Sequence, residues 1–280
     1  MSATIPTPRA GSPPFWPKQA TLDLLSRIGK RQRMFPIRDH NPSERTPLVT
    51  YAIIAANVVI YLYQLSISGD QAALAAFTYH WALFPVAVTE GGEYTGLFSH
   101  MFLHAGFLHL AGNMLFLWIF GDNLEDQMGH VGFLIFYVAS GLVAAIAQIL
   151  PDPASTIPMV GASGAIAGVM GGYLLLFPRA RVDILLIFII FFRVFSIPAF
   201  VVLGLWFAFQ IFGGLGTPTQ EGGVAYWAHA GGFVAGILLT LPIWARRGAR
   251  NWWQANQGQP PHPEATYAPS TIPLVIRKRK

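Results

Sequence analysis

The polar side chains that lie within apolar stretches of this chain are few, and their types suit acyl transfer. Ser163 lies in the motif GASG, and His229 lies in the motif AHAGG. A serine hydroxyl becomes an effective nucleophile when a neutral imidazole accepts its proton. No acidic residue accompanies either side chain in its stretch. We therefore predict a Ser–His dyad, with Ser163 as the nucleophile and His229 as the general base.

A third apolar stretch, HAGFLHLAGNMLFLW, contains His104, His109 and Asn113. His109 and Asn113 are four residues apart and therefore share one face of a helix. Both side chains can donate a hydrogen bond to a developing oxyanion, together with the backbone N–H of Ser163. We therefore predict that His109 and Asn113 line an oxyanion hole.

The sequence predicts no metal site and no other cofactor. His100, His104 and His109 invite a zinc interpretation, but they do not all share one helix face, and no HExxH-type glutamate lies between them. The chain contains no cysteine, which excludes a disulfide, a thiol nucleophile and a cysteine-based zinc site.

Residue counts place Ser163 and His229 at one depth in a membrane. Ser163 lies 16 residues before Arg179, and His229 lies 17 residues before Arg246. If both arginines mark one interface, a helical rise of about 1.5 Å per residue puts the two side chains roughly 24–26 Å above it. Because the hydrocarbon core is about 30 Å thick, we expect both side chains to lie below the outer surface.

The elements that must position these residues are membrane helices. The sequence is 53% hydrophobic and 11% charged, whereas soluble domains contain about 25% charged residues. About 20 apolar residues are needed to cross a bilayer, and six stretches approach that length. They fall near 48–66, 103–121, 131–150, 161–177, 195–213 and 224–245. We therefore predict an all-α membrane protein with six transmembrane helices.

The basic residues predict the orientation of these helices. There is no Lys or Arg between Thr46 and Pro178, whereas clusters occupy both ends of the chain and the connection 178–194. This positive-inside pattern predicts that both termini are cytoplasmic. No nucleic-acid motif accompanies the basic residues, so we interpret them as contacts with the lipid bilayer and expect no nucleic-acid partner.

The chain divides into three regions. Residues 1–45 are rich in proline and basic residues and are expected to form a disordered cytoplasmic arm. Residues 46–245 form the membrane domain, and residues 246–280 form a basic, proline-containing cytoplasmic tail. Within the membrane domain, the aromatic-rich first loop 67–102 and the segment 184–192 are expected to lie in the membrane interface.

Glycines on two of the predicted helices indicate unusually close packing. The stretch 161–177 carries glycines at near three-to-four-residue spacing, and the stretch 224–245 carries a GxxxG motif. The positions are Gly161, Gly164, Gly168, Gly171, Gly172, Gly232 and Gly236. Two such helices can bring Ser163 and His229 into contact.

Three motifs, HxxxxHxxxN, GxSG and AHxxGxxxG, occur in this order, each within an apolar stretch. Together they resemble the rhomboid family of intramembrane serine proteases over about residues 46–245. The resemblance implies a six-helix bundle around a water-filled cavity that opens to the outside. It also implies the roles predicted above for Ser163, His229, His109 and Asn113, and a structural or gating role for His104.

The resemblance extends to a cytoplasmic turn and has two departures. Gly121, Glu125 and Gly129 resemble the GxxxExxxG turn of the family, in which the glutamate ties helix ends together. Thr95-Gly96 stands where a Trp-Arg pair is common in the first loop. Ala167 stands where an aromatic often stacks on the histidine, so His229 must be oriented by another group.

The predicted function is an intramembrane serine endopeptidase that cleaves transmembrane proteins near the outer membrane face. The alternative is a catalytically silent relative that binds or escorts membrane proteins. A transporter is disfavoured because no repeat relates the two halves of the sequence. The short tails and the lack of a transit-type presequence favour a bacterial inner membrane, whereas the basic, acid-poor N-terminus leaves an organelle open. The oligomeric state is open as well.

Overall fold

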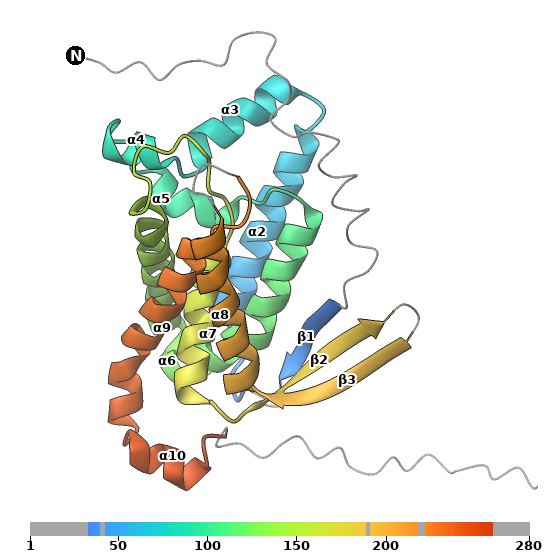
Figure 1. Cartoon of the computed structure of the whole chain (residues 1–280), viewed down its shortest axis with the longest axis vertical. Coiled ribbons are helices and arrows are strands. Elements are labelled where there is room, and N and C mark those ends of the chain that lie inside the picture. The colour runs from blue at the N-terminus through green and yellow to red at the C-terminus, as the bar shows by residue number, and fades with distance from the viewer. Residues whose placement is uncertain (1–32, 40–42, 189–190, 218–221, 260–280) are drawn as a thin grey trace, which may run out of the picture.

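The computed structural model describes residues 33–39, 43–188, 191–217 and 222–259, and it is mostly helical (Figure 1). The helices are α2 (Leu48–Ser66), α3 (Gln71–Trp81), α4 (Pro85–Thr89), α5 (Gly96–Ser99), η2 (His100–Phe102), α6 (Phe107–Ile149), α7 (Ser163–Leu176), α8 (Ala199–Gly216), α9 (Tyr226–Arg246) and α10 (Arg250–Asn256). The strands are β1 (Arg33–Asp39), β2 (Arg181–Phe188) and β3 (Phe191–Pro198).

Within the described residues, four helices are long and apolar enough to cross a membrane, namely α2, α6, α8 and α9. Helix α6 contains two of the stretches predicted as separate spans. Gly129 divides it with non-helical angles of φ 70° and ψ 165°, which glycine adopts without steric penalty. Helix α7 is apolar but only 14 residues long, because the chain before it is irregular.

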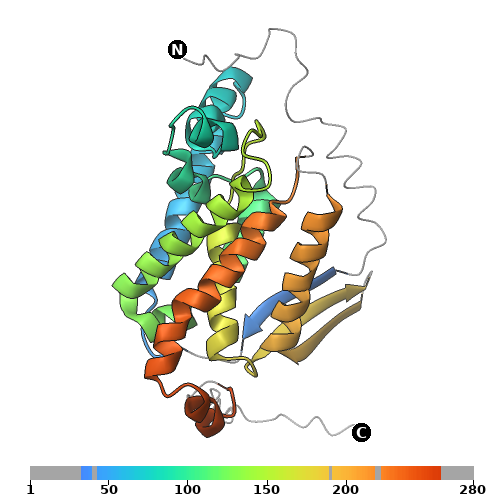
Figure 2. The same cartoon turned by 60° about the vertical axis from the view of Figure 1, so that its left-hand side comes forward.

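The purely helical prediction is wrong for one part of the chain. Strands β1, β2 and β3 form an antiparallel sheet in that order, at the same end of the molecule as α10 (Figures 1 and 2). Of the segment 184–192, residues 184–188 therefore belong to β2 and residues 191–192 to β3, and their β-branched and aromatic residues favour strands. Residues 189–190 lie outside the described residues. Because β3 continues to Pro198, α8 begins at Ala199 and not at residue 195.

The disorder expected of residues 1–45 does not hold for β1. Asp39, at the end of this strand, accepts hydrogen bonds from Tyr173 Oη at 2.8 Å and from Asn123 Nδ2 at 2.9 Å. Burial, reinforced by the negative charge of Asp122, raises the pKa of Asp39 to about 8. Residues 1–32 and 40–42 of the predicted arm, and 260–280 of the predicted tail, lie outside the described residues.

The first loop is ordered as the short helices α3, α4 and α5. These helices lie at the end of the bundle opposite the sheet in both views (Figures 1 and 2). Asp70 caps α3 by accepting hydrogen bonds from the N–H groups of Ala72 and Ala73, as acidic N-cap residues do. Trp81, Tyr94 and Phe98 of this loop are exposed, which is typical of aromatic residues at a membrane interface.

Helix α7 lies at the centre of the bundle, and nearly all of its residues are buried. It packs against α9 through glycines on both helices. A Cβ atom at Gly232 would lie 2.0 Å from the carbonyl oxygen of Gly164, and one at Gly236 would lie 1.9 Å from that of Gly168. The predicted close approach of these two helices is therefore confirmed.

Glu125 ties the start of α2 to the turn in α6. The side chain is 2% exposed and accepts hydrogen bonds from the N–H groups of Val49 and Thr50, both at 2.8 Å. It also accepts one from Thr50 Oγ1 at 2.7 Å and pairs with His130 Nδ1 at 2.5 Å. These contacts match the helix-tying role that the resemblance implied for this glutamate.

Candidate active site

Ser163 and His229 lie at the beginnings of two adjacent helices. Ser163 is the first residue of α7, and His229 lies in the first turn of α9. His229 Nε2 and Ser163 Oγ are 2.7 Å apart, which is hydrogen-bonding distance. Both side chains are half-buried. The structure therefore brings the two residues of the predicted dyad into direct contact.

Ser163 lies below the end of the bundle because the chain before α7 enters it as irregular backbone. Met159 forms an isolated antiparallel bridge with Leu83, and the N–H of Gly161 donates to the carbonyl of His100 at 2.8 Å. Gly161 has a φ of 126°, which disfavours any other residue at this position. In a membrane such backbone is tolerated where protein covers it or where it lines a cavity.

The ring of His229 is held by α8. His229 Nδ1 lies 2.8 Å from Gln210 Oε1, and Gln210 Nε2 donates to the carbonyl of Trp206 at 3.0 Å. The second hydrogen bond turns the amide oxygen of Gln210 toward the histidine. His229 therefore carries its proton on Nδ1, and its Nε2 is free to accept the proton of Ser163. This is the tautomer that a general base requires.

Trp206 also contacts the imidazole directly. The ring centroids of Trp206 and His229 are 5.7 Å apart with an interplanar angle of 34°. Ala167 leaves no aromatic ring on α7 to stack on the histidine, as the sequence indicated. Trp206 from α8 contacts the histidine instead. Trp206 and Gln210 together orient the ring of His229.

Gln210 is not among the site residues predicted from the sequence, although the sequence contains a signal for it. Gln210 is 7% exposed and lies in the otherwise apolar run AFVVLGLWFAFQIFGG. A polar side chain within a membrane span is rare and needs a partner. The polarity of Gln210 within this span was therefore the signal that could have identified it.

We expect the substitution Gln210→Leu to lower kcat about tenfold, because one hydrogen bond worth about 1.4 kcal/mol is lost from the base. Gln210→Glu, which keeps an acceptor for the Nδ1 proton, should lose less. KM should change little, since Gln210 contacts Nδ1 of His229, whereas Ser163 contacts Nε2. Steady-state kinetics with a membrane substrate measures both parameters.

Gln254→Leu in α10 makes the same chemical change at an exposed position and serves as the control. It should retain the kinetics of the unsubstituted protein. If Gln210→Leu lowers kcat no more than Gln254→Leu, Gln210 does not position the base. Thermal unfolding of each variant shows whether a lower kcat comes from a misplaced His229 ring or from loss of the folded protein.

His109 and Asn113 lie beside the irregular backbone that precedes Ser163. A Cβ atom at Gly161 would lie 2.8 Å from His109 Nε2 and 3.6 Å from Asn113 Nδ2. The N–H of Ala105 donates to His109 Nδ1 at 3.4 Å, which leaves Nε2 as the donor nitrogen of the ring. Both side chains therefore present N–H donors beside Gly161, which lies two residues before Ser163 in the sequence.

His104 contacts the predicted oxyanion-hole residues and not the dyad. Its Nε2 lies 2.9 Å from Asn113 Nδ2, and its ring meets that of His109 edge-on with centroids 5.1 Å apart. The backbone N–H of His104 donates to Gln64 Oε1 at 3.1 Å. The side chain is 2% exposed. These contacts suit a residue that holds His109 and Asn113 in place.

His100, His104 and His109 have separate hydrogen-bond partners. His100 Nδ1 lies 2.9 Å from the carbonyl oxygen of Gly96, while His104 and His109 contact Asn113 and the N–H of Ala105. In the described part of the chain, no group of three or more His, Cys, Asp or Glu side chains has a geometry that could hold a metal ion.

Comparison with known proteins gives one domain family and several relatives. The family described as the Rhomboid domain matches residues 91–246, more than half of the chain. A mitochondrial protein of Saccharomyces cerevisiae named Rhomboid protein 1 is 35% identical over 144 residues, which is 49% of this chain and 38% of that protein.

Two bacterial relatives carry protease names. Rhomboid protease GluP of Bacillus subtilis is 34% identical over 128 residues, which is 46% of this chain and 24% of that protein. Rhomboid protease GlpG of Salmonella paratyphi A is 31% identical over 120 residues, 43% of this chain and 41% of that protein. The match therefore spans less than half the length of each of these relatives.

Proposed function

This chain belongs to the rhomboid family, and we propose that it is an intramembrane serine endopeptidase that cleaves transmembrane proteins near the outer membrane face. The observation that carries the proposal is the 2.7 Å contact between Ser163 Oγ and His229 Nε2. The protease names of the relatives GluP and GlpG support the same reaction class.

In the proposed reaction, Ser163 Oγ attacks the carbonyl carbon of the scissile peptide bond. His229 Nε2 accepts the hydroxyl proton as the new C–O bond forms, and it then donates that proton to the leaving amine. Water that enters from the outer side hydrolyses the acyl-enzyme, with His229 again acting as the base. Gln210 accepts a hydrogen bond from Nδ1 both before and after Nε2 is protonated but, as a neutral amide, takes up no proton.

The developing oxyanion is proposed to lie between α7 and the side chains of His109 and Asn113. The first N–H groups of a helix have no intrahelical acceptor, so the start of α7 offers backbone donors beside Ser163. The positive end of the α7 dipole favours a negative charge at the same place. His109 Nε2 and Asn113 Nδ2 add side-chain donors that are fixed before the substrate arrives.

We further propose six spans, with both termini in the cytoplasm and the dyad near the opposite face. In this topology α6 counts as two spans that meet at Gly129, and α7 counts as a short central one. The arginines at the sheet and α10 end, such as Arg181 and Arg250, support this orientation by the positive-inside rule. The proposed location is a bacterial inner membrane, and the similarity to the yeast mitochondrial protein makes an organelle membrane the alternative.

A fluorophosphonate probe tests the proposal, because it reacts with serines that are activated as nucleophiles. The purified protein in detergent should be labelled stoichiometrically, and mass spectrometry should map the label to the peptide that contains Ser163. Protein unfolded by heat before the probe is added is the control and should remain unlabelled.

Label at a different serine would place the nucleophile elsewhere. A folded protein that takes up no label would instead support a silent relative that binds or escorts membrane proteins. Co-purification with membrane proteins and the absence of cleavage would then be expected.

A further inference from the structure

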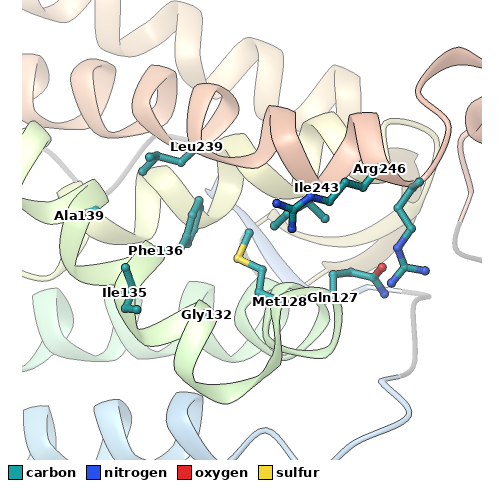
Figure 3. Close-up of a pocket in the computed structure, with 10 residues that line it drawn as sticks. Gln127, Met128, Gly132, Ile135, Phe136, Ala139, Leu239, Ile243 and Arg246 are labelled. Atoms are coloured by element: carbon teal, nitrogen blue, oxygen red, sulfur yellow. The ribbon is translucent and has the colours of Figure 1, made fainter.

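A groove of about 510 Å³ lies between α6 and α9, far from the dyad. Figure 3 shows side chains of both helices pointing into it, with Ile135 and Phe136 from α6 and Leu239 and Ile243 from α9. His229 lies 17 residues before Arg246 on α9, which corresponds to about 25 Å along the helix. The groove is therefore separate from the active site and lies toward the end with the sheet and α10.

The apolar part of the groove faces outward. Ile135 is 65% exposed and Leu239 is 41% exposed, whereas Phe136 is 5% exposed and closes the groove from inside. Because α6 and α9 are candidate membrane spans, the surroundings of these exposed side chains are lipid chains. The volume lies within the range of ligand sites, about 300–1,000 Å³.

One end of the groove is positively charged. Arg246 and Arg247 line it there, and both are exposed. No Asp or Glu is among the lining residues. Gln127 lies at the same end (Figure 3), and its Oε1 atom is buried without a hydrogen-bond partner among the described residues. Two arginines can hold a phosphate through bidentate hydrogen bonds.

From this arrangement, the geometry points to a binding site for one anionic phospholipid of the cytoplasmic leaflet. The phosphate lies against Arg246 and Arg247, beside Gln127, and the acyl chains run along Ile135 and Leu239. The two arginines adjoin the apolar part of the groove, so a ligand that fills both parts must be an amphiphile with an anionic head group. The site depends on the proposed membrane orientation but not on proteolytic activity.

Native mass spectrometry of the purified full-length protein tests this proposal. The protein in detergent is titrated with phosphatidylglycerol and, separately, with phosphatidylcholine that has the same acyl chains. We expect one phosphatidylglycerol per chain, bound at least tenfold more tightly than phosphatidylcholine. The double variant Arg246→Gln/Arg247→Gln should lose at least tenfold in affinity for phosphatidylglycerol and keep its affinity for phosphatidylcholine.

The control is the double variant Arg193→Gln/Arg250→Gln, which removes the same charge from exposed positions outside the groove. Its phosphatidylglycerol affinity should stay within about twofold. Equal losses in the two double variants would overturn the proposal in favour of diffuse surface attraction. Equal binding of the two lipids by the unsubstituted protein would overturn it as well.

Two further measurements separate a lipid from a simple anion. Inorganic phosphate at millimolar concentration should not displace phosphatidylglycerol, because it lacks acyl chains; displacement would identify a site for free anions. Gly132→Phe puts a ring into the groove, where a Cβ atom would meet only Met128 Cβ, at 3.3 Å. This variant should weaken phosphatidylglycerol binding with both arginines in place, and unchanged binding would place the lipid elsewhere.

Discussion

Replacing Ser163 or His229 with alanine is expected to lower the rate of peptide-bond cleavage by on the order of 10⁴-fold or more. In the proposed mechanism the serine supplies the attacking oxygen and the histidine removes its proton in the same step, so neither residue can act without the other. For that reason the double variant should be no slower than either single variant. Cleavage of a transmembrane substrate reconstituted with the protein in liposomes measures the rate.

Matched substitutions outside the site serve as controls. Ser66→Ala and His80→Ala change the same residue types at exposed positions and should retain full cleavage. Thermal unfolding of Ser163→Ala should be close to that of the unsubstituted protein, because one hydrogen bond is lost. His229→Ala also loses the hydrogen bond to Gln210 and the contact with Trp206, so it should unfold at a somewhat lower temperature but still cooperatively. A His229→Ala variant that still cleaves at the original rate would remove the histidine from the mechanism.

The contact within the dyad was predictable because helical geometry converts a residue count into a depth. Arg179 and Arg246 served as reference points, and the counts of 16 and 17 residues to Ser163 and His229 differ by less than one turn of helix. The glycines of α7 and α9 showed in addition that the two helices approach closely. Depth and proximity together were enough to predict that the two side chains meet.

The orientation of His229 was not predictable by the same means. Gln210 and Trp206 lie on α8, whose rotation about its own axis and tilt are set by packing against α9 and not by hydrophobic periodicity. An apolar helix carries little periodicity when lipid covers most of its surface. The glutamine alone marked the inward face of α8, since a buried amide requires a partner.

The sheet was missed because a long apolar run has two interpretations. The run from Ile184 to Phe195 is hydrophobic enough for a helix but rich in β-branched and aromatic residues, which favour strands. Pairing with β1 on one side and β3 on the other satisfies the backbone groups of β2, and Asp39 at the end of β1 accepts a hydrogen bond from Tyr173. These are long-range contacts, and local sequence patterns do not reveal them.

The substitution Gly236→Ala is expected to lower the free energy of unfolding by on the order of 3 kcal/mol and to abolish cleavage. The added Cβ atom would lie 1.9 Å from the carbonyl oxygen of Gly168 and 2.6 Å from its Cα atom. Both are backbone atoms of a central helix, so no side-chain rotation can relieve the contact. Helices α7 and α9 must then separate, and the hydrogen bond between Ser163 and His229 is lost with their packing.

Gly204→Ala provides the same chemical change on α8, where a Cβ atom would meet nothing within 4 Å. Alanine is preferred to glycine within a helix by roughly 0.5–1 kcal/mol, so this variant should be as stable as the unsubstituted protein or slightly more so. Thermal unfolding in detergent, followed by tryptophan fluorescence, compares the two, and fluorophosphonate labelling reports on the dyad. The contrary result would be a Gly236→Ala protein that unfolds at the same temperature as Gly204→Ala and still takes up the label. In that case α7 and α9 could move apart without loss of the site. Close glycine packing would then not be what holds Ser163 against His229.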